Sequence, residues 1–179
     1  MSIDIITGCM FSGKTTELMH RVTQHLSIGQ SVVVINHSID TRYGDTKSIT
    51  SHDGKSLKAW KVERLYDVDD KVKICNVVAI DEAQFFPDLV PYVLKWCDVY
   101  KKKVIVAGLM TDYKREKFGE ISDLIHFSDS VTHKTAYCSQ CANGKRAIFT
   151  KKMSFATVQI DVGSTDKYIP LCRSCYLKV

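Results

Sequence analysis

Residues 3–15 read IDIITGCMFSGKT, and the segment from Gly8 to Thr15 fits the pattern G-x-x-x-x-G-K-[ST]. An apolar, β-rich run at residues 3–7 comes before the pattern, and a helical pattern of apolar residues comes after it. This strand, loop and helix order is the context in which the pattern forms a phosphate-binding loop. A chance match in a glycine-rich turn is the alternative, and the context argues against it. The sequence therefore predicts a site for a nucleoside triphosphate.

The residue types in this segment suit the binding of phosphate. Gly8 and Gly13 permit a tight loop whose backbone N–H groups face inward, and the N-terminus of the helix adds partial positive charge. The lysine of such a loop, here Lys14, reaches the β- and γ-phosphates, and the hydroxyl residue, here Thr15, ligates Mg²⁺. The predicted phosphate-binding residues are Gly8, Cys9, Met10, Phe11, Ser12, Gly13, Lys14 and Thr15.

Short apolar runs alternate with helical patterns through the first 133 residues. Leu18, Val22 and Leu26 lie four residues apart and predict a helix, with Gly29 where its C-terminal cap would lie. Continuous apolar runs are typical of parallel strands that are covered on both faces. Such runs occupy residues 32–36, 77–80 and 104–108, and residues 89–100 have the length and composition of a helix. This alternation predicts a three-layer P-loop α/β domain with a central, mainly parallel (RecA-like) sheet.

A pair of adjacent carboxylates, Asp81 and Glu82, follows the apolar run at residues 77–80. A phosphate-binding loop needs a second carboxylate near Mg²⁺ at the end of a neighbouring strand, and Asp81 has that position. We expect Glu82 to point away from Asp81, because side chains alternate in direction along an extended segment. Glu82 would then activate water, as in an NTPase, or accept a proton from a hydroxyl group, as in a kinase. An exposed strand-end carboxylate without a chemical role is the third possibility.

Four of the seven cysteines form two C-x-x-C pairs, Cys138 with Cys141 and Cys172 with Cys175. Their number and pairing fit a structural Zn²⁺ site, whereas disulfides or a redox pair are the alternatives. The segment between the pairs is longer than the roughly 15–20 residues of a usual zinc ribbon, so a long loop is expected to project from the zinc unit. The remaining cysteines stand alone in apolar surroundings and are predicted to be buried thiols without chemistry: Cys9, Cys75 and Cys97.

The sequence changes in character near residue 133. Strand-like runs such as AIFT (147–150) replace the helical patterns after this point. We therefore predict a P-loop α/β domain at residues 1–133 and a zinc-ribbon-like β subdomain with a long loop at residues 134–179. The polar segment at residues 37–60 is predicted mostly as loop, with room for a hairpin.

Composition places the chain among ordinary globular proteins, because 45% of its residues are hydrophobic and 25% are charged. No apolar run approaches the roughly 20 residues of a membrane helix, and the N-terminus does not resemble a secretory signal. We therefore expect a cytoplasmic protein without a membrane partner. The net charge of +5 is mild, and the lysine clusters at 101–103 and 151–152 are interpreted as solvated residues. A nucleic-acid partner is not expected, since such a surface would need a longer basic stripe.

Six segments resemble, in order, the type II thymidine kinases, a family of animal cytosolic, bacterial, poxvirus and phage enzymes. They are MFSGKTTEL (10–18), DTRYG (40–44), IDEAQFF (80–86), AGLMTDYKREKFGE (107–120), YCSQC (137–141) and DKYIPLCRSCY (166–176). Two departures stand out: Ser164 follows Gly163 where many relatives have a second glycine, and Cys9 replaces a proline common in the animal and viral branch.

The resemblance implies transfer of the γ-phosphoryl group of Mg-ATP to the 5′-hydroxyl of thymidine or deoxyuridine. Glu82 matches the general base of the family, and Lys14 is the second residue expected to act in catalysis. The nucleotide-binding segments of the family match Asp40, Thr41 and Arg42, and also Asp81 and Gln84. The deoxynucleoside site matches Met10, Phe85, Leu109, Tyr113, Phe118 and Tyr168, together with a lasso loop that contains Gln159, Ile160, Asp161, Val162 and Gly163. The family is typically tetrameric and inhibited by thymidine triphosphate, so both properties are expected here.

Other interpretations of these residues stay open at this point. A purely structural role is the alternative for Phe85, Phe118 and Tyr168, because aromatic side chains often pack beneath loops at strand ends. Leu109 and Met10 could equally be core residues. The DEAQ segment at 81–84 also resembles the box of nucleic-acid-dependent ATPases, in which a zinc ribbon could grip DNA. The chain length argues against a nucleic-acid-dependent ATPase of this class, because such an enzyme needs two α/β lobes. An ATP-binding module without catalysis is the last alternative.

Overall fold

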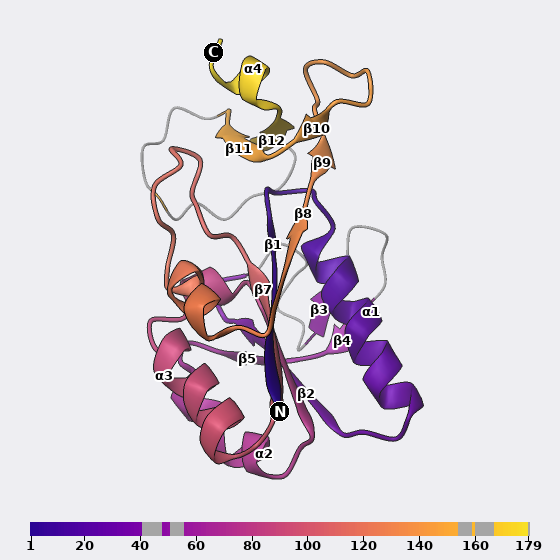
Figure 1. Ribbon diagram of the computed structural model, residues 1–179, viewed down its shortest axis with the longest axis vertical. Helices are drawn as coiled ribbons and strands as arrows, with labels where there is room; N and C mark the ends of the chain where they lie inside the picture. Colours follow the sequence, from indigo (N-terminus) through magenta and orange to yellow (C-terminus); the bar gives the residue numbers. More distant parts are fainter. Residues whose placement is uncertain (41–47, 51–55, 154–158, 160–166, 179) are drawn as a thin grey trace.

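A six-stranded parallel sheet forms the centre of the computed structural model, which describes residues 1–40, 48–50, 56–153, 159 and 167–178 (Figure 1). The strand order is β5-β2-β6-β7-β1-β8, and each neighbouring pair is parallel. The strands are β1 (Ser2–Gly8), β2 (Val32–His37), β5 (Trp60–Val62), β6 (Val77–Asp81), β7 (Lys103–Gly108) and β8 (Ser130–Lys134). The predicted α/β fold with a mainly parallel sheet is therefore confirmed.

Helices and a hairpin cover the two faces of the sheet and give it three layers. Successive strand residues face opposite clusters: Val78 and Ile80 lie in one, and Val77 and Ala79 lie in the other. One cluster includes residues of η1 (Leu65–Val68), α2 (Asp69–Lys73), α3 (Leu89–Leu94), its continuation η3 (Lys95–Val99) and η4 (Ile121–Phe127). The other includes residues of α1 (Lys14–Ser27), β3 (Ser48–Thr50) and the chain beside β4 (Ser56–Lys58). Figure 1 shows α1 on one side of the sheet and α2 and α3 on the other.

Helix α1 follows the predicted periodicity only in part. Leu18 and Val22 are buried, but Leu26 is 47% exposed. A spacing of four residues drifts by about 40° per step on a helix of 3.6 residues per turn, so Leu26 has rotated away from the sheet. Gly29 has φ 77° directly after the helix, and Gln30 N–H donates to the His25 carbonyl across it. The predicted glycine at the end of α1 is thus confirmed.

A second, smaller unit lies beyond the carboxyl ends of β1 and β8 (Figure 1). It consists of the antiparallel pairs β9 (Ala136–Tyr137) with β10 (Arg146–Ala147) and β11 (Phe149–Lys152) with β12 (Tyr168–Leu171), followed by α4 (Arg173–Tyr176). We call this unit the cysteine subdomain. The proposed division between residues 133 and 134 stays a prediction; in the structure β8 runs to Lys134, which pairs with Gly8 in the main sheet.

The segment at residues 37–60, predicted mostly as loop, contains more structure than expected. The antiparallel hairpin β3–β4 and the first residue of the edge strand β5 lie within it, so the hairpin alternative is confirmed. Residues 41–47 and 51–55 of this segment lie outside the described residues. Among the helices that are described, none combines the length and the apolar character that a membrane span requires.

Asp69 fastens α2 to the helix formed by α3 and η3. Its carboxylate accepts hydrogen bonds from Lys95 Nζ at 2.9 Å, from Trp96 Nε1 at 2.8 Å and from the Tyr100 hydroxyl at 3.0 Å. The Trp96 side chain is fully buried, so its N–H depends on this partner. Burial acts to raise the pKa of Asp69, but the bonds from Lys95, Trp96 and Tyr100 together outweigh it and lower the pKa below its usual value.

We expect Asp69→Ala to reduce the free energy of unfolding by about 1–3 kcal/mol, because the buried indole N–H loses its acceptor. The matched control is Asp70→Ala, since the Asp70 side chain is 92% exposed and pairs only with Lys73 among the described residues. Urea unfolding measures both variants, and an Asp69 variant as stable as the Asp70 variant would contradict the assignment. Because the pKa of Asp69 is lowered on folding, its contribution is present above about pH 4 and is lost as the pH falls through the folded pKa.

Candidate functional site

The predicted phosphate-binding loop lies between β1 and α1, where its backbone takes three left-handed conformations. Gly8 has φ 146°, Phe11 has φ 63° and Gly13 has φ 80°. Glycine adopts such values at little cost, which explains the two glycines of the pattern, whereas Phe11 carries local strain. The Cys9 carbonyl accepts hydrogen bonds from Ser12 N–H at 3.4 Å and from Lys14 Nζ at 2.9 Å. The lysine of the motif therefore lies folded over the loop.

Ser12 is unusual among the described residues because its buried hydroxyl oxygen has no hydrogen-bond partner. A buried polar atom without a partner costs free energy unless a ligand or water satisfies it. The hydroxyl belongs to the loop that the sequence assigns to phosphate. This orphaned group fits a loop that is completed by a phosphate oxygen.

The carboxylate of Asp81 meets the first turn of α1. Asp81 ends β6 and is 3% exposed, and its Oδ2 accepts a hydrogen bond from Thr15 Oγ1 at 2.9 Å. A hydroxyl and a carboxylate side by side are hard oxygen ligands of the kind that Mg²⁺ prefers. The pair predicted for the metal side of the site is therefore in contact, and its donor set fits Mg²⁺.

Glu82 leaves the strand immediately after Asp81. It has φ 50° and ψ 41°, so the extended alternation that we expected for its direction does not apply to it. Its side chain is not an exposed strand-end carboxylate, because the residue is 8% exposed and its Oε2 accepts a 2.6 Å hydrogen bond from Gln84 Nε2. A left-handed backbone at a glutamate costs of order 1–3 kcal/mol and is found most often at functional sites.

Gln84 links Glu82 to the end of β7. Its Oε1 accepts a hydrogen bond from Leu109 N–H at 3.0 Å, and the residue is 4% exposed. Gly119 packs directly against the Gln84 backbone, since a Cβ at Gly119 would lie 2.2 Å from the Gln84 carbonyl oxygen. The nucleotide-binding role expected for Gln84 stays a prediction; in the structure its side chain bonds Glu82 and the Leu109 N–H.

Aromatic side chains lie next to these carboxylates. The rings of Phe85 and Phe118 meet edge to face with 5.5 Å between centroids, and Phe85 also contacts His37 at 5.7 Å. Phe118 and Tyr168 are buried, while Met10, Phe85 and Leu109 are partly exposed. Burial lowers the pKa of His37.

An open cavity of about 650 Å³ is lined by Phe85 together with His37, Ser38, Ile39, Glu63, Arg64 and Pro87.

Two further groups of predicted site residues are described only in part. Asp40 is buried, and its Oδ2 accepts a hydrogen bond from Asn36 Nδ2 at 3.0 Å. Gln159 donates from Nε2 to Asp112 Oδ2 at 2.9 Å, so this residue lies against the loop that carries Tyr113. The other members of these groups, Thr41, Arg42, Ile160, Asp161, Val162 and Gly163, lie outside the described residues.

Sequence reasoning missed two buried polar residues beside the site. Asp112 is 5% exposed and accepts backbone hydrogen bonds from Lys114 and Glu116 in addition to the bond from Gln159. Asn36 is 2% exposed and pairs in register with Asp81 across β2 and β6. The available signals were an aspartate at the start of a turn and an asparagine that ends an apolar strand.

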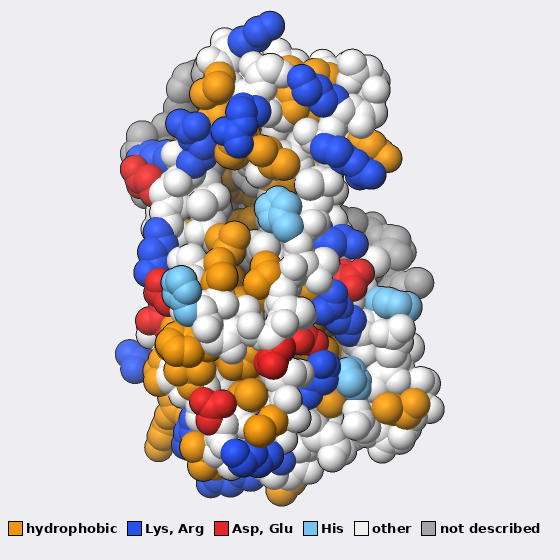
Figure 2. All heavy atoms as spheres, viewed as in Figure 1, with side chains coloured by type: hydrophobic (Ala, Val, Ile, Leu, Met, Phe, Trp, Pro, Cys, Tyr) orange, Lys and Arg blue, Asp and Glu red, His pale blue; other side chains and the backbone are white. Residues whose placement is uncertain are grey.

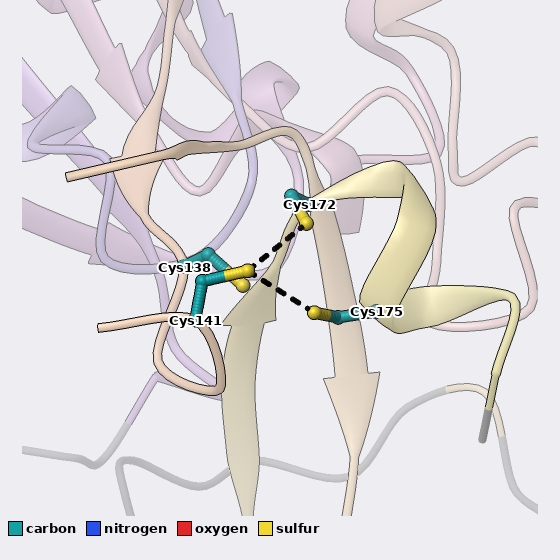
Figure 3. A group of neighbouring side chains, drawn as sticks. All are labelled: Cys138, Cys141, Cys172 and Cys175. Atoms are coloured by element: carbon teal, nitrogen blue, oxygen red, sulfur yellow. Dashed lines mark hydrogen bonds between the residues drawn. The ribbon is translucent and has the colours of Figure 1, made fainter. Parts of the chain in front are cut away.

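The four paired cysteines converge as predicted (Figure 3). Their sulfur atoms all lie within 4.8 Å of one another, and Cys141 Sγ lies 3.8 Å from Cys172 Sγ and 3.3 Å from Cys175 Sγ. Tetrahedral zinc with Zn–S of about 2.3 Å requires sulfur atoms about 3.8 Å apart, so the geometry fits a closed four-thiolate site. A hydrogen bond with the Ser174 hydroxyl lowers the pKa of Cys172 to about 6, whereas the hydrogen bond with Cys141 raises the pKa of Cys175 to about 12. The cysteines predicted to be inert, Cys9, Cys75 and Cys97, are all buried and free.

We expect metal analysis of the purified protein to find one zinc ion per chain. Cys172→Ser should lower both the zinc content and Tm, because one of four ligands is lost. Cys75→Ser is the matched control, since Cys75 is buried elsewhere and donates to the Val72 carbonyl. Zinc-free protein, or equal zinc in both variants, would rule out the metal assignment.

Positive charge gathers around the cysteine subdomain. Figure 2 shows Lys and Arg side chains over this end of the molecule, and residues 134–153 and 167–178 contain no aspartate or glutamate. The phosphate-binding loop lies next to this region. A positive field raises the local concentration of anionic ligands, so this surface favours the approach of a nucleotide.

The similarity to known proteins extends over nearly the whole chain. The family model "Thymidine kinase" matches residues 1–176. The chain belongs to the thymidine kinase family. Among its relatives, "Thymidine kinase" of Oryza sativa subsp. japonica is 42% identical over 98% of this chain and 66% of the relative. "Thymidine kinase" of Choristoneura fumiferana entomopoxvirus is 39% identical over 98% and 96%, and "Thymidine kinase, cytosolic" of Cricetulus griseus is 38% identical over 98% and 73%.

The thymidine kinase match confirms the family resemblance drawn from the six segments. It also favours a kinase over the nucleic-acid-dependent ATPase that the DEAQ segment left open, since the matched region includes residues 81–84. Among solved structures, a chain described as "crystal structure of DNA replication initiation factor" aligns with 74% of this chain and 40% of its own length, at 11% identity and a TM-score of 0.44.

Proposed function

We propose that this member of the thymidine kinase family transfers the γ-phosphoryl group of Mg-ATP to the 5′-hydroxyl of thymidine, and also of deoxyuridine. The observation that carries the proposal is the arrangement at the end of β6. Asp81 contacts Thr15 on the phosphate-loop side, while Glu82 turns away in a left-handed conformation and is held by Gln84. Two adjacent carboxylates thus have different partners, which suits one to the metal and the other to an acceptor hydroxyl.

The phosphate-binding loop is proposed to hold the triphosphate. Backbone N–H groups of the loop between Gly8 and Thr15 and the Ser12 hydroxyl would donate hydrogen bonds to phosphate oxygens. Lys14 would exchange its bond with the Cys9 carbonyl for the β- and γ-phosphates. Mg²⁺, when bound, neutralises charge that develops on the transferred group, and Thr15 and Asp81 are the residues placed to hold it.

Glu82 is proposed to accept the proton of the 5′-hydroxyl as the oxygen attacks the γ-phosphorus. The bond between the γ-phosphorus and the bridging oxygen of ADP breaks as the new P–O bond forms, and the proton passes to Glu82. The hydrogen bond from Gln84 at 2.6 Å to Oε2 of Glu82 fixes the orientation of the carboxylate for this step. Lys14 would stabilise the charge on the transferred phosphoryl group.

The deoxynucleoside is proposed to lie near Met10, Phe85, Leu109, Tyr113, Phe118 and Tyr168, with Gln159 to Gly163 closing over it. The rings of Phe85 and Phe118 are in contact, and Leu109 N–H donates to Gln84, the residue that holds Glu82. These contacts support the proposed position of the deoxynucleoside. Tyr113 lies beside the cysteine subdomain, whose Tyr176 donates to its carbonyl. A closed loop would exclude water and so prevent hydrolysis of ATP.

Regulation and assembly form the rest of the proposal. The thymidine kinase resemblance supports a homotetramer that is inhibited by thymidine triphosphate. The relative named as cytosolic supports a cytoplasmic location. Light scattering of the purified protein tests the tetramer, and inhibition of turnover by added thymidine triphosphate tests the feedback.

The deciding experiment is ADP formation from Mg-ATP with thymidine, deoxyuridine, deoxycytidine, uridine or single-stranded DNA offered separately. We expect turnover with thymidine and deoxyuridine alone. Turnover with DNA and none with nucleosides would replace the kinase with an ATPase in which Glu82 activates water. Nucleotide binding without turnover on any acceptor would reduce the protein to a binding module.

A further inference from the structure

Three consecutive residues of the phosphate-binding loop contact remote segments: Gly8 contacts the end of β8, and Cys9 and Met10 contact the cysteine subdomain. A Cβ at Gly8 would lie 2.1 Å from the Lys134 carbonyl oxygen, so the loop begins in close contact with the end of β8. Cys9 Sγ donates to the Ala147 carbonyl at 3.4 Å. Met10 N–H donates to Thr150 Oγ1 at 3.0 Å. Residues more than 120 positions apart in the chain therefore meet at this joint.

Cys9 is part of the core of the cysteine subdomain. It is 4% exposed and belongs to the apolar cluster that also contains two of the zinc-site cysteines, Cys138 and Cys172. The same residue touches Lys14, because its carbonyl accepts the bond from Lys14 Nζ. Cys9 thus stands between the metal site and the lysine that is proposed to act on phosphate.

Thr150 supplies the polar part of the joint. It lies in β11, where it pairs with Pro170 of β12, and it is 7% exposed. Pro170 is two positions before the zinc-site residue Cys172. Its hydroxyl accepts the N–H of Met10, a donor of the loop that would otherwise lack a partner among the described residues. The position of β11 therefore fixes the orientation of this peptide group.

We propose that Cys9 and Thr150 are positioning residues through which zinc binding and nucleotide binding stabilise each other. Zinc binding would fix the positions of Cys138 and Cys172, which lie in the apolar cluster that contains Cys9. This packing in turn would keep the phosphate-binding loop in the conformation that binds phosphate. A nucleotide bound to the loop stabilises the same packing from the other side. This inference rests on the proposed use of the loop for a nucleotide, but not on the identity of the acceptor.

Linkage requires that the effect be reciprocal. If zinc raises the affinity for nucleotide by some factor, nucleotide raises the affinity for zinc by the same factor. The coupling is therefore measurable from the metal side, without turnover. Saturating Mg-ADP should raise the zinc affinity of the wild-type protein, measured at equilibrium against a chromogenic chelator, by about 5- to 100-fold, the usual range of such couplings.

Variants at Thr150 distinguish the effect of its hydrogen bond with Met10 from a general loss of stability. Thr150→Val keeps the shape but leaves Met10 N–H without an acceptor, so it should weaken Mg-ADP binding about 5- to 100-fold. It should also abolish the protection of zinc by Mg-ADP at saturating nucleotide. Thr150→Ser retains the hydroxyl and should restore both properties. Thr23→Val, on the exposed side of α1 where the hydroxyl only bonds the Met19 carbonyl, is the matched control and should change neither.

The experiment uses zinc-loaded full-length protein, with calorimetry for Mg-ADP affinity and chelator absorbance for zinc affinity at equilibrium. Protection in the wild type that is lost in Thr150→Val and regained in Thr150→Ser supports the inference. A wild type that binds Mg-ADP but keeps the same equilibrium affinity for zinc overturns it, as does a Thr150→Val variant that retains full protection. If Thr150→Val fails to fold, the wild-type and serine arms still decide. A chain without thymidine turnover that shows the coupling would sink the proposed function and leave this inference standing.

Discussion

Glu82→Gln is expected to lower kcat for thymidine by about two to four orders of magnitude, because the amide cannot accept the proton of the 5′-hydroxyl. The change keeps the size of the side chain and an oxygen that can accept the bond from Gln84 Nε2. We therefore expect Mg-ATP affinity to stay close to that of the wild type. Steady-state turnover and calorimetric titration with Mg-ADP measure the two quantities separately.

The control for this variant is Glu116→Gln, which removes the same charge at an exposed position. Turnover by the control should match the wild type. A Glu82 variant with near-normal kcat would remove Glu82 as the general base. A variant that lost nucleotide affinity together with kcat would instead assign Glu82 to the triphosphate.

Gly8→Ala is expected to reduce the free energy of unfolding by about 2–6 kcal/mol, because strain of about 1–3 kcal/mol at a positive φ adds to overpacking of about 1–3 kcal/mol. The new methyl group would lie 2.1 Å from the Lys134 carbonyl oxygen, an atom of the main-chain ladder between β1 and β8. Neither strand can move without breaking this ladder. The loop that follows Gly8 would be displaced, so nucleotide affinity should fall as well.

The matched control is Gly29→Ala, because Gly29 also has a positive φ of 77° but no heavy atom within 4 Å of the added carbon. It should cost only about 1–2 kcal/mol, the strain of the left-handed conformation itself. Urea unfolding and Mg-ADP titration of both variants test the comparison. Equal destabilisation by the two substitutions would show that crowding against β8 contributes nothing.

The interior of the sheet could be predicted from sequence, whereas its edges could not. Strands β2, β6 and β7 are covered on both faces, so their apolar runs are continuous and easily recognised. The edge strands β5 and β8 lack that signature, since most of Ser130–Lys134 is exposed or half-buried. Edge position depends on strand order, which is set by contacts between residues far apart in the chain.

The candidate site shows the same division between local and distant information. The phosphate-binding loop, Asp81 and the cysteine cluster were found because their chemistry depends on short spacings. The left-handed backbone of Glu82 was not anticipated, and Asp112 and Thr150 were missed. Asp112 and Thr150 each have a partner in a remote segment: Gln159 for Asp112 and Met10 for Thr150.

The place of β1 in the sheet has a consequence for synthesis of the chain. Strand β1 leaves the ribosome before both of its neighbours in the sheet, β7 and β8, with Ser2 opposite Lys103 and Asp4 opposite Ser130. Such high contact order slows folding, because a long loop must close before the pairing stabilises it. This apolar strand therefore has neither neighbour until residues 103–134 have been synthesised. During that interval the nascent chain exposes an apolar strand with unpaired edges, the kind of segment that favours aggregation.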